Sequence, residues 1–151
     1  MNSSDKQSRE LSTFREFVER AGLGLDASSA TNRNPPEPDV LCLDNDRNPH
    51  AFELVELCDS EIAQLYGRRA LPSASAMFVG GPDYSKVERK LTNNYVTTAT
   101  PHLLCYADGR TVAPDDLLIA ELREIDFSKQ SNFSTVWFMG EKQVLQLFSA
   151  R

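Results

Sequence analysis

The fold is decided by residues 38–59, PDVLCLDNDRNPHAFELVELCD, which hold two apolar runs separated by a polar segment. The runs at 40–43 and 51–58 have the length and composition of strands that are covered on both faces. The segment 44–49 between them contains asparagine, aspartate and proline, which are typical of turns. The sequence therefore predicts an antiparallel hairpin.

Acidic side chains interrupt this otherwise apolar hairpin. Alternation along the second strand places Glu53 on one face of the sheet and Glu56 on the other. Whichever face is buried therefore carries a carboxylate, which is costly to bury unless it is neutralised, paired or bound to a cation. Asp39 stands at the start of the preceding strand, close to Glu53. We therefore expect a cation site in this hairpin.

The segments before the hairpin predict a helix and a loop. Apolar residues recur at helical intervals over 11–21, and the helix should end near Gly22. Its apolar stripe should pack on the sheet, and its charged side chains, Glu10 among them, should be mostly solvated, with the alternative that one glutamate reaches a site. The polar, proline-containing segment 26–38 predicts an exposed loop.

The segments after the hairpin predict helices that alternate with strands. They are a short helix that Asp59 caps, with Ile62, Leu65 and Tyr66 on one side; a strand or loop at 76–79; a helix from Asp83 to about Asn93; a strand over 101–106; a helix from Pro114 with Leu117, Leu118, Leu122 and Ile125 facing inward; and a terminal hairpin of 134–139 and 143–148. This order predicts an α/β or α+β fold, with a central mixed sheet flanked by helices.

Length and composition fit one globular domain over residues 1–151. No apolar run approaches the roughly 20 residues that span a bilayer, and the first ten residues lack the apolar segment of a secretory signal. We therefore expect a cytoplasmic protein with no membrane partner. Cys42, Cys58 and Cys105 have no metal-ligand spacing and are expected to be buried free thiols.

Two smaller features complete the set of candidate residues. The formal charge of −6 argues against broad attraction to nucleic acid but leaves room for a local basic surface. The helix with Lys86, Arg89 and Lys90, preceded by an arginine pair at 68–69, is the best candidate for contacting phosphates, and a solvated helix face is the alternative. The isolated histidines at 50 and 102 fit no nucleophile motif and are expected to be structural or exposed.

The order of a helix, a strand beginning with Pro38-Asp39, an adjacent strand with Glu53-Leu54-Val55, a helix and a further apolar strand resembles the core of the PD-(D/E)xK nuclease superfamily, the restriction-endonuclease-like fold. The resemblance covers roughly residues 8–107. It implies that Asp39 and Glu53 ligate one or two divalent cations, usually Mg²⁺, with Mn²⁺ as a substitute. The family lysine helps to position or activate the attacking water.

The chain departs from the family pattern at the lysine, because Val55 occupies that position. Members of the superfamily also supply this charge from another element, so the resemblance implies Lys86 and Lys90 as substitutes. Glu56 is another candidate, but alternation sends it to the opposite face of the sheet unless a bulge intervenes.

Three functions follow as expectations. The first is a divergent, magnesium-dependent nuclease that hydrolyses nucleic-acid phosphodiester bonds. The second is a catalytically degenerate module of the same fold that binds a nucleic-acid or protein partner. The third is a structural subunit of a larger assembly, which requires an exposed apolar edge on the terminal hairpin. The sequence leaves the polymer and the oligomeric state open.

Overall fold

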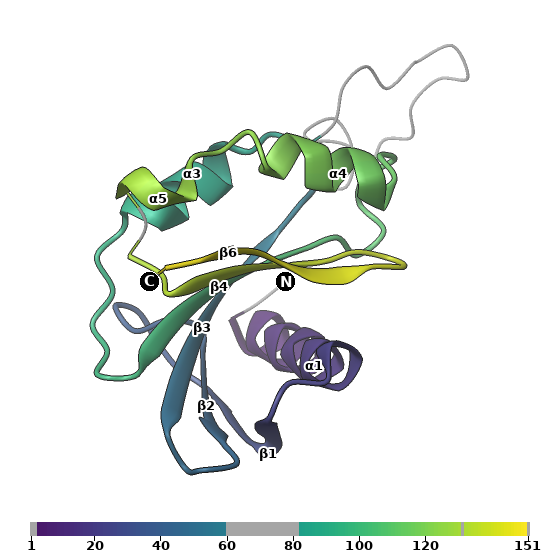
Figure 1. The fold of residues 1–151 in the computed structure, drawn as a ribbon. Coiled ribbons are helices and arrows are strands. Elements are labelled where there is room, and N and C mark those ends of the chain that lie inside the picture. The colour runs from purple at the N-terminus through teal and green to yellow at the C-terminus, as the bar shows by residue number, and fades with distance from the viewer. Residues whose placement is uncertain (1–2, 60–81, 131, 151) are drawn as a thin grey trace.

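The computed structural model describes residues 3–59, 82–130 and 132–150, which form a six-stranded mixed sheet flanked by helices (Figure 1). The elements are α1 (Ser3–Ala21), β1 (Leu25–Asn32), β2 (Val40–Asp44), β3 (Pro49–Glu56), α3 (Ser85–Thr92), β4 (Thr100–Tyr106), α4 (Asp115–Leu122), α5 (Phe127–Gln130), β5 (Thr135–Met139) and β6 (Val144–Ser149). The α+β class with a central mixed sheet is therefore confirmed.

The strands lie in the sheet in their chain order, from β1 to β6. The pairs β1–β2, β2–β3 and β5–β6 are antiparallel, so both predicted hairpins are confirmed. The pairs β3–β4 and β4–β5 are parallel. Parallel neighbours need a crossover, which is why helices separate these strands in the sequence.

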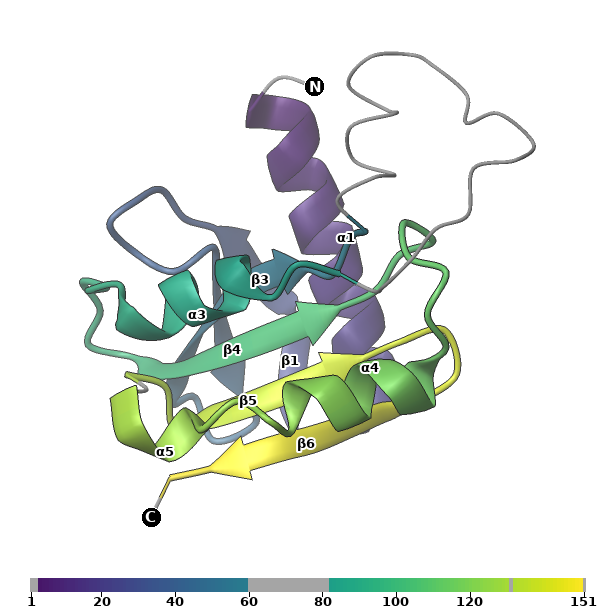
Figure 2. The ribbon, with the colours of Figure 1, turned by 90° about the horizontal axis from the view of Figure 1, so that it is seen from above.

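Helices cover both faces of the sheet and create two cores. Figures 1 and 2 show α1 on one face and α3, α4 and α5 on the other. Phe52 and Leu54 of β3 pack with residues of α1, whereas Val55 packs with residues of α3 and α4. The predicted alternation is therefore confirmed, and it places Glu53 on the same face as α3.

The prediction of an exposed loop over 26–38 is wrong for 26–32, because β1 occupies Leu25–Asn32, whereas 33–38 lie in no strand or helix and 33–36 are exposed. The register of β1 with β2 shifts within this strand. At the shift, the Ser29 hydroxyl accepts a hydrogen bond from the Leu43 N–H at 2.8 Å and donates one to the Asp26 carbonyl at 2.6 Å. An edge strand tolerates polar side chains, so its composition is that of a loop.

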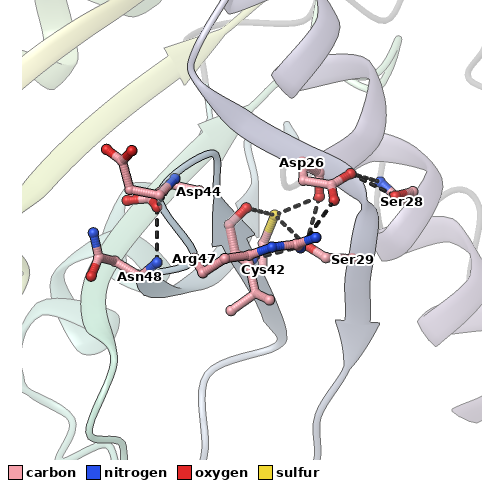
Figure 3. A network of polar contacts seen from close by, with 9 residues as sticks. Asp26, Ser28, Ser29, Cys42, Asp44, Arg47 and Asn48 are labelled. Carbon is pink, nitrogen blue, oxygen red and sulfur yellow. Dashed lines mark hydrogen bonds and ion pairs between the residues drawn. The ribbon is translucent and has the colours of Figure 1, made fainter.

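Figure 3 shows the polar network that surrounds this shift. The Cys42 thiol donates to the Asp26 carbonyl at 3.2 Å, and the Asp26 carboxylate accepts from both the N–H and the hydroxyl of Ser28. Arg47, in the turn between β2 and β3, lies 3.6 Å from the same carboxylate. Small side chains that serve as both donors and acceptors therefore hold β1 to β2 where the backbone ladder is interrupted.

Other differences between expectation and structure are local. Leu118 and Leu122 of α4 are fully buried as predicted, but Leu117 is 47% exposed, so its inward placement is wrong. Cys42 and Cys105 are buried free thiols, whereas Cys58 is only half-buried. The predicted helix after Asp59, the segment 76–79 and the arginine pair at 68–69 lie outside the described residues. Among the described helices, none is both long and apolar enough to cross a membrane.

Candidate functional site

The site begins where β3 extends beyond the end of β2. The first residue of β2, Val40, pairs with Phe52, so β3 continues to Glu56 with no further ladder partner on β2. Asp39, the residue directly before Val40, lies beside this unpaired part of β3. Its Oδ2 accepts a hydrogen bond from the Leu54 N–H at 2.9 Å, and its own N–H donates to Glu53 Oε1 at 3.1 Å. The end of the hairpin ladder therefore brings the two predicted acids together.

Glu53 is held by side chains from the α3 side of the sheet. Its side chain is only 6% exposed, and its Oε2 accepts from the Lys90 ammonium at 2.5 Å and from the Tyr95 hydroxyl at 3.2 Å. Burial, with the neighbouring Glu53 carboxylate, raises the pKa of Tyr95, so the hydroxyl remains a donor. Each Glu53 oxygen therefore has a donor of its own.

Burial disfavours the charged forms of both carboxyl groups, so it raises the pKa of each. Burial raises the pKa of Glu53, and the charge of Asp39 raises it further, while Lys90 opposes the rise. Burial also raises the pKa of Asp39; the Leu54 N–H opposes this rise, and the charge of Glu10 adds to it. Negative charge therefore accumulates in a poorly solvated place, and a cation would relieve it.

Glu10 is a site residue that the sequence does not single out, since the sequence favours a solvated side chain and leaves a glutamate in the site only as the alternative. It was expected to be mainly solvated, but the residue is only 9% exposed and lines the same pocket as Asp39. Its position on the helix could have indicated this. Glu10 precedes Phe14 by four residues and Phe17 by seven, so it extends the buried stripe of α1 by one turn.

The pocket around these acids has a volume of about 670 Å³ and lies between α1, α3 and the end of β3. Its acidic lining residues are Glu10, Asp39 and Glu56, so Glu53 adjoins the pocket only through Asp39 and Lys90. Six basic residues complete the charged lining: Lys6, Arg9, Lys86, Arg89, Lys90 and Arg110. The basic residues come from two helices and one loop. A chain of net charge −6 therefore concentrates positive charge at one place, which suits an anionic ligand.

Glu56 lies on the opposite face of the sheet from Glu53, as alternation predicts. Arg9 Nη2 lies 2.9 Å from Glu56 Oε1, and Arg110 Nε lies 3.5 Å from Glu56 Oε2. Arginines from α1 and from the loop after β4 therefore neutralise this carboxylate. The structure does not bring Glu56 to the acid pair.

The two candidate lysines occupy different positions. Lys90 contacts Glu53, whereas Lys86 lines the pocket and makes no described contact with either carboxylate. Val55 is 4% exposed and packs in the core beneath α3. The lysine that the resemblance expects on β3 is therefore absent there, and α3 supplies an ammonium group to the same face.

The carboxylate oxygens of Asp39 and Glu53 suit a hard cation, although they are few. Among the described residues, no group of three His, Cys, Asp or Glu side chains is arranged to hold a metal ion. Magnesium, however, usually takes only one or two carboxylates and completes its shell with water and substrate phosphates. Asp39 and Glu53 meet that need.

The two histidines are joined rather than isolated. His50 Nδ1 lies 2.9 Å from His102 Nε2, His50 Nε2 lies 2.9 Å from Asp44 Oδ2, and His102 Nδ1 lies 2.5 Å from the Thr135 hydroxyl. All four ring nitrogens are engaged, which suits a structural role. Burial, with the neighbouring His50, lowers the pKa of His102 to about 4.

Comparison with protein-family models, with curated proteins and with solved structures found no match for this chain. The function therefore has to be inferred from the geometry of the pocket. The features that bear on it are the contact of half-buried Asp39 with buried Glu53, the ammonium of Lys90 and the basic residues of the pocket lining.

Proposed function

We propose that this protein is a divergent, metal-dependent, nuclease-like enzyme that hydrolyses phosphodiester bonds of nucleic acid. One observation carries the proposal. Asp39 contacts Glu53, which accepts from Lys90, and Asp39 and Lys90 both line a pocket with twice as many basic as acidic residues. Paired carboxylates with a neighbouring ammonium are suited to a cation and a phosphate.

Asp39 and Glu53 would hold the cation, and water would complete its shell. A bound magnesium or manganese ion supplies Lewis-acid polarisation of the phosphate and a more acidic bound water. Glu10 adds negative charge beside Asp39 and so favours the cation.

The chain itself would bind and orient the polymer. Lys90 places a positive charge where negative charge develops on the phosphate, which is the task of the lysine missing at Val55. Lys86 and Arg89, one turn or less away on α3, would bind neighbouring phosphates. Among the described elements the order is α1, β1, β2, β3, α3 and β4, so β1 is added to the order on which the resemblance to the PD-(D/E)xK superfamily rests. Membership of that superfamily and a cytoplasmic location are part of the proposal.

The first prediction tests hydrolysis. Purified protein with MgCl₂ or MnCl₂ should cleave single-stranded DNA, double-stranded DNA or RNA, and a chelator should stop the reaction. Asp39→Asn and Glu53→Gln should lower the rate by at least about 100-fold, since each removes a ligand charge while keeping side-chain volume. Lys129→Met, on α5 outside the pocket, is the matched control for surface substitution. If no polymer is cleaved, or if both acid variants remain fully active, the enzymatic proposal is wrong.

A second candidate function is a degenerate module of the same fold that binds nucleic acid or a protein partner. It is favoured by Val55 at the lysine position and by the low exposure of Glu53, whose oxygens already accept from three donors. Calorimetry separates the two functions. Binding of nucleic acid with neither cation binding nor cleavage would support the module and exclude the enzyme.

A further inference from the structure

The hydrogen bonds of Glu53 leave little room for another ligand. A carboxylate has about four lone-pair positions. Three are engaged here, by the Asp39 N–H on Oε1 and by the Lys90 ammonium and the Tyr95 hydroxyl on Oε2. A cation that binds through Oε2 must therefore displace a donor.

Of the two donors at Oε2, the charged Lys90 ammonium opposes a bound cation most strongly. The Lys90 nitrogen lies 2.5 Å from Oε2, and a magnesium ion would bind an oxygen at about 2.0–2.1 Å, so the two positive centres would be within about 5 Å of each other. The Glu53 side chain is 6% exposed, which limits screening by solvent. The ammonium and the cation would therefore repel each other strongly.

We propose that Lys90 and a divalent cation compete for the Glu53 carboxylate, so that Lys90 weakens cation binding in the absence of nucleic acid. This inference rests on the cation site proposed above. It adds that one residue both balances the charge of the acid pair and sets its affinity for the ion.

The position of Lys90 on α3 allows the exchange. Val87 and Leu91 anchor α3 in the core, with 0% and 4% exposure, so the helix backbone is fixed. The Lys90 side chain is 30% exposed and ends in a flexible four-carbon stem. Its ammonium can therefore turn from Glu53 into the pocket it lines, toward a phosphate bound there.

The experiment is calorimetric titration of the protein alone with MgCl₂ and with MnCl₂, at fixed ionic strength near neutral pH. Lys90→Met, which keeps side-chain length, should bind each cation at least about tenfold more tightly than the native protein. Lys90→Arg keeps the charge and should stay within about threefold of native. Lys90→Gln is the second neutral variant, and thermal unfolding checks that each variant folds.

Two matched variants separate charge from other effects. Lys86→Met removes the same charge one turn away on α3, and its affinity should change by no more than about threefold. Tyr95→Phe removes the neutral donor from the same oxygen and should strengthen binding much less than Lys90→Met.

The outcomes are distinguishable. Equal affinities for the native protein, Lys90→Met and Lys90→Gln would overturn the competition while leaving the cation site in place. Equal gains in Lys90→Met and Lys86→Met would also overturn it, because they would show a general charge effect. Binding of neither cation to any variant would refute the cation site and, with it, this inference.

Discussion

At the scale of the residue, buried polar side chains are matched to partners from distant parts of the chain. Glu53 meets Lys90 and Tyr95, and Asp59 accepts from the Thr111 hydroxyl at 2.7 Å and the Val112 N–H at 3.0 Å. Removing one partner from such a contact leaves a desolvated group, which costs more than the contact contributes. Single substitutions at these positions are therefore informative.

His102 predicts a pH dependence of stability. Its pKa is about 4 in the folded protein, against 6.5 for the ordinary side chain. As the pH falls from 6.5 to 4, His102 binds a proton in the unfolded chain but stays largely neutral in the folded protein. The free energy of unfolding should therefore fall by about 3 kcal/mol over this range from His102 alone.

Urea unfolding across this pH range, for the native protein and for His102→Gln, measures the effect. The variant should be less stable near neutral pH, since glutamine cannot reproduce both ring contacts, but its stability should depend less on pH. Parallel profiles for the two proteins would contradict the assignment.

At the scale of the element, amphipathic helices position the site. The stripe of Tyr84, Val87 and Leu91 seats α3 on the core, and this orientation presents Lys90 to Glu53. Likewise, the Phe14 and Phe17 side of α1 places Glu10 next to Asp39. Hydrophobic packing therefore fixes where the charges lie.

Helix α4 offers a matched pair of adjacent leucines for testing the core. Leu118 is 0% exposed and Leu117 is 47% exposed. Leu118→Ala should lower the free energy of unfolding by about 2–5 kcal/mol, because it removes buried apolar surface and leaves a cavity. Leu117→Ala should change it by no more than about 0.5 kcal/mol. Urea unfolding of both variants checks the difference, and equal losses would contradict the orientation of α4.

At the scale of the whole molecule, charge is unevenly distributed. The chain carries a formal charge of −6, yet basic residues from α1, α3 and the loop after β4 surround one pocket. The fold brings these basic residues together where β3 extends beyond the end of β2. A polyanion would be attracted to the pocket and repelled by the rest of the molecule, which is acidic.

Salt dependence tests that arrangement. If nucleic acid binds at the pocket, its affinity should fall with salt concentration, with a logarithmic slope that grows by about 0.7–0.9 for each phosphate contacted. The triple variant of Lys6, Lys86 and Arg89 to glutamine should bind more weakly and reduce that slope. Replacing Lys129 with glutamine should leave the slope unchanged, because Lys129 lies on α5. An unaltered slope in the triple variant would place binding elsewhere.

Much of the fold could be predicted from local patterns. The β2–β3 and β5–β6 hairpins and the spans of α1, α3 and β4 follow from apolar periodicity and turn residues, which are properties of neighbouring positions. Strand β1 could not be found in this way. At its register shift the Ser29 hydroxyl, which bonds the Leu43 N–H and the Asp26 carbonyl, replaces a missing backbone bond, and the local sequence pattern does not predict such a contact.

From the sequence alone it follows that Asp39 directly precedes one strand of the hairpin and Glu53 lies in the other, that Glu53 and Glu56 face opposite sides, and that the chain forms a mixed sheet with helices. The packed fold was needed to show that Lys90 rather than Lys86 contacts Glu53, that Glu10 lies beside Asp39, and that His50 contacts His102. The physical reason is distance along the chain. Alternation and helical periodicity assign a side chain to a face, but the packing of separate elements decides which faces meet.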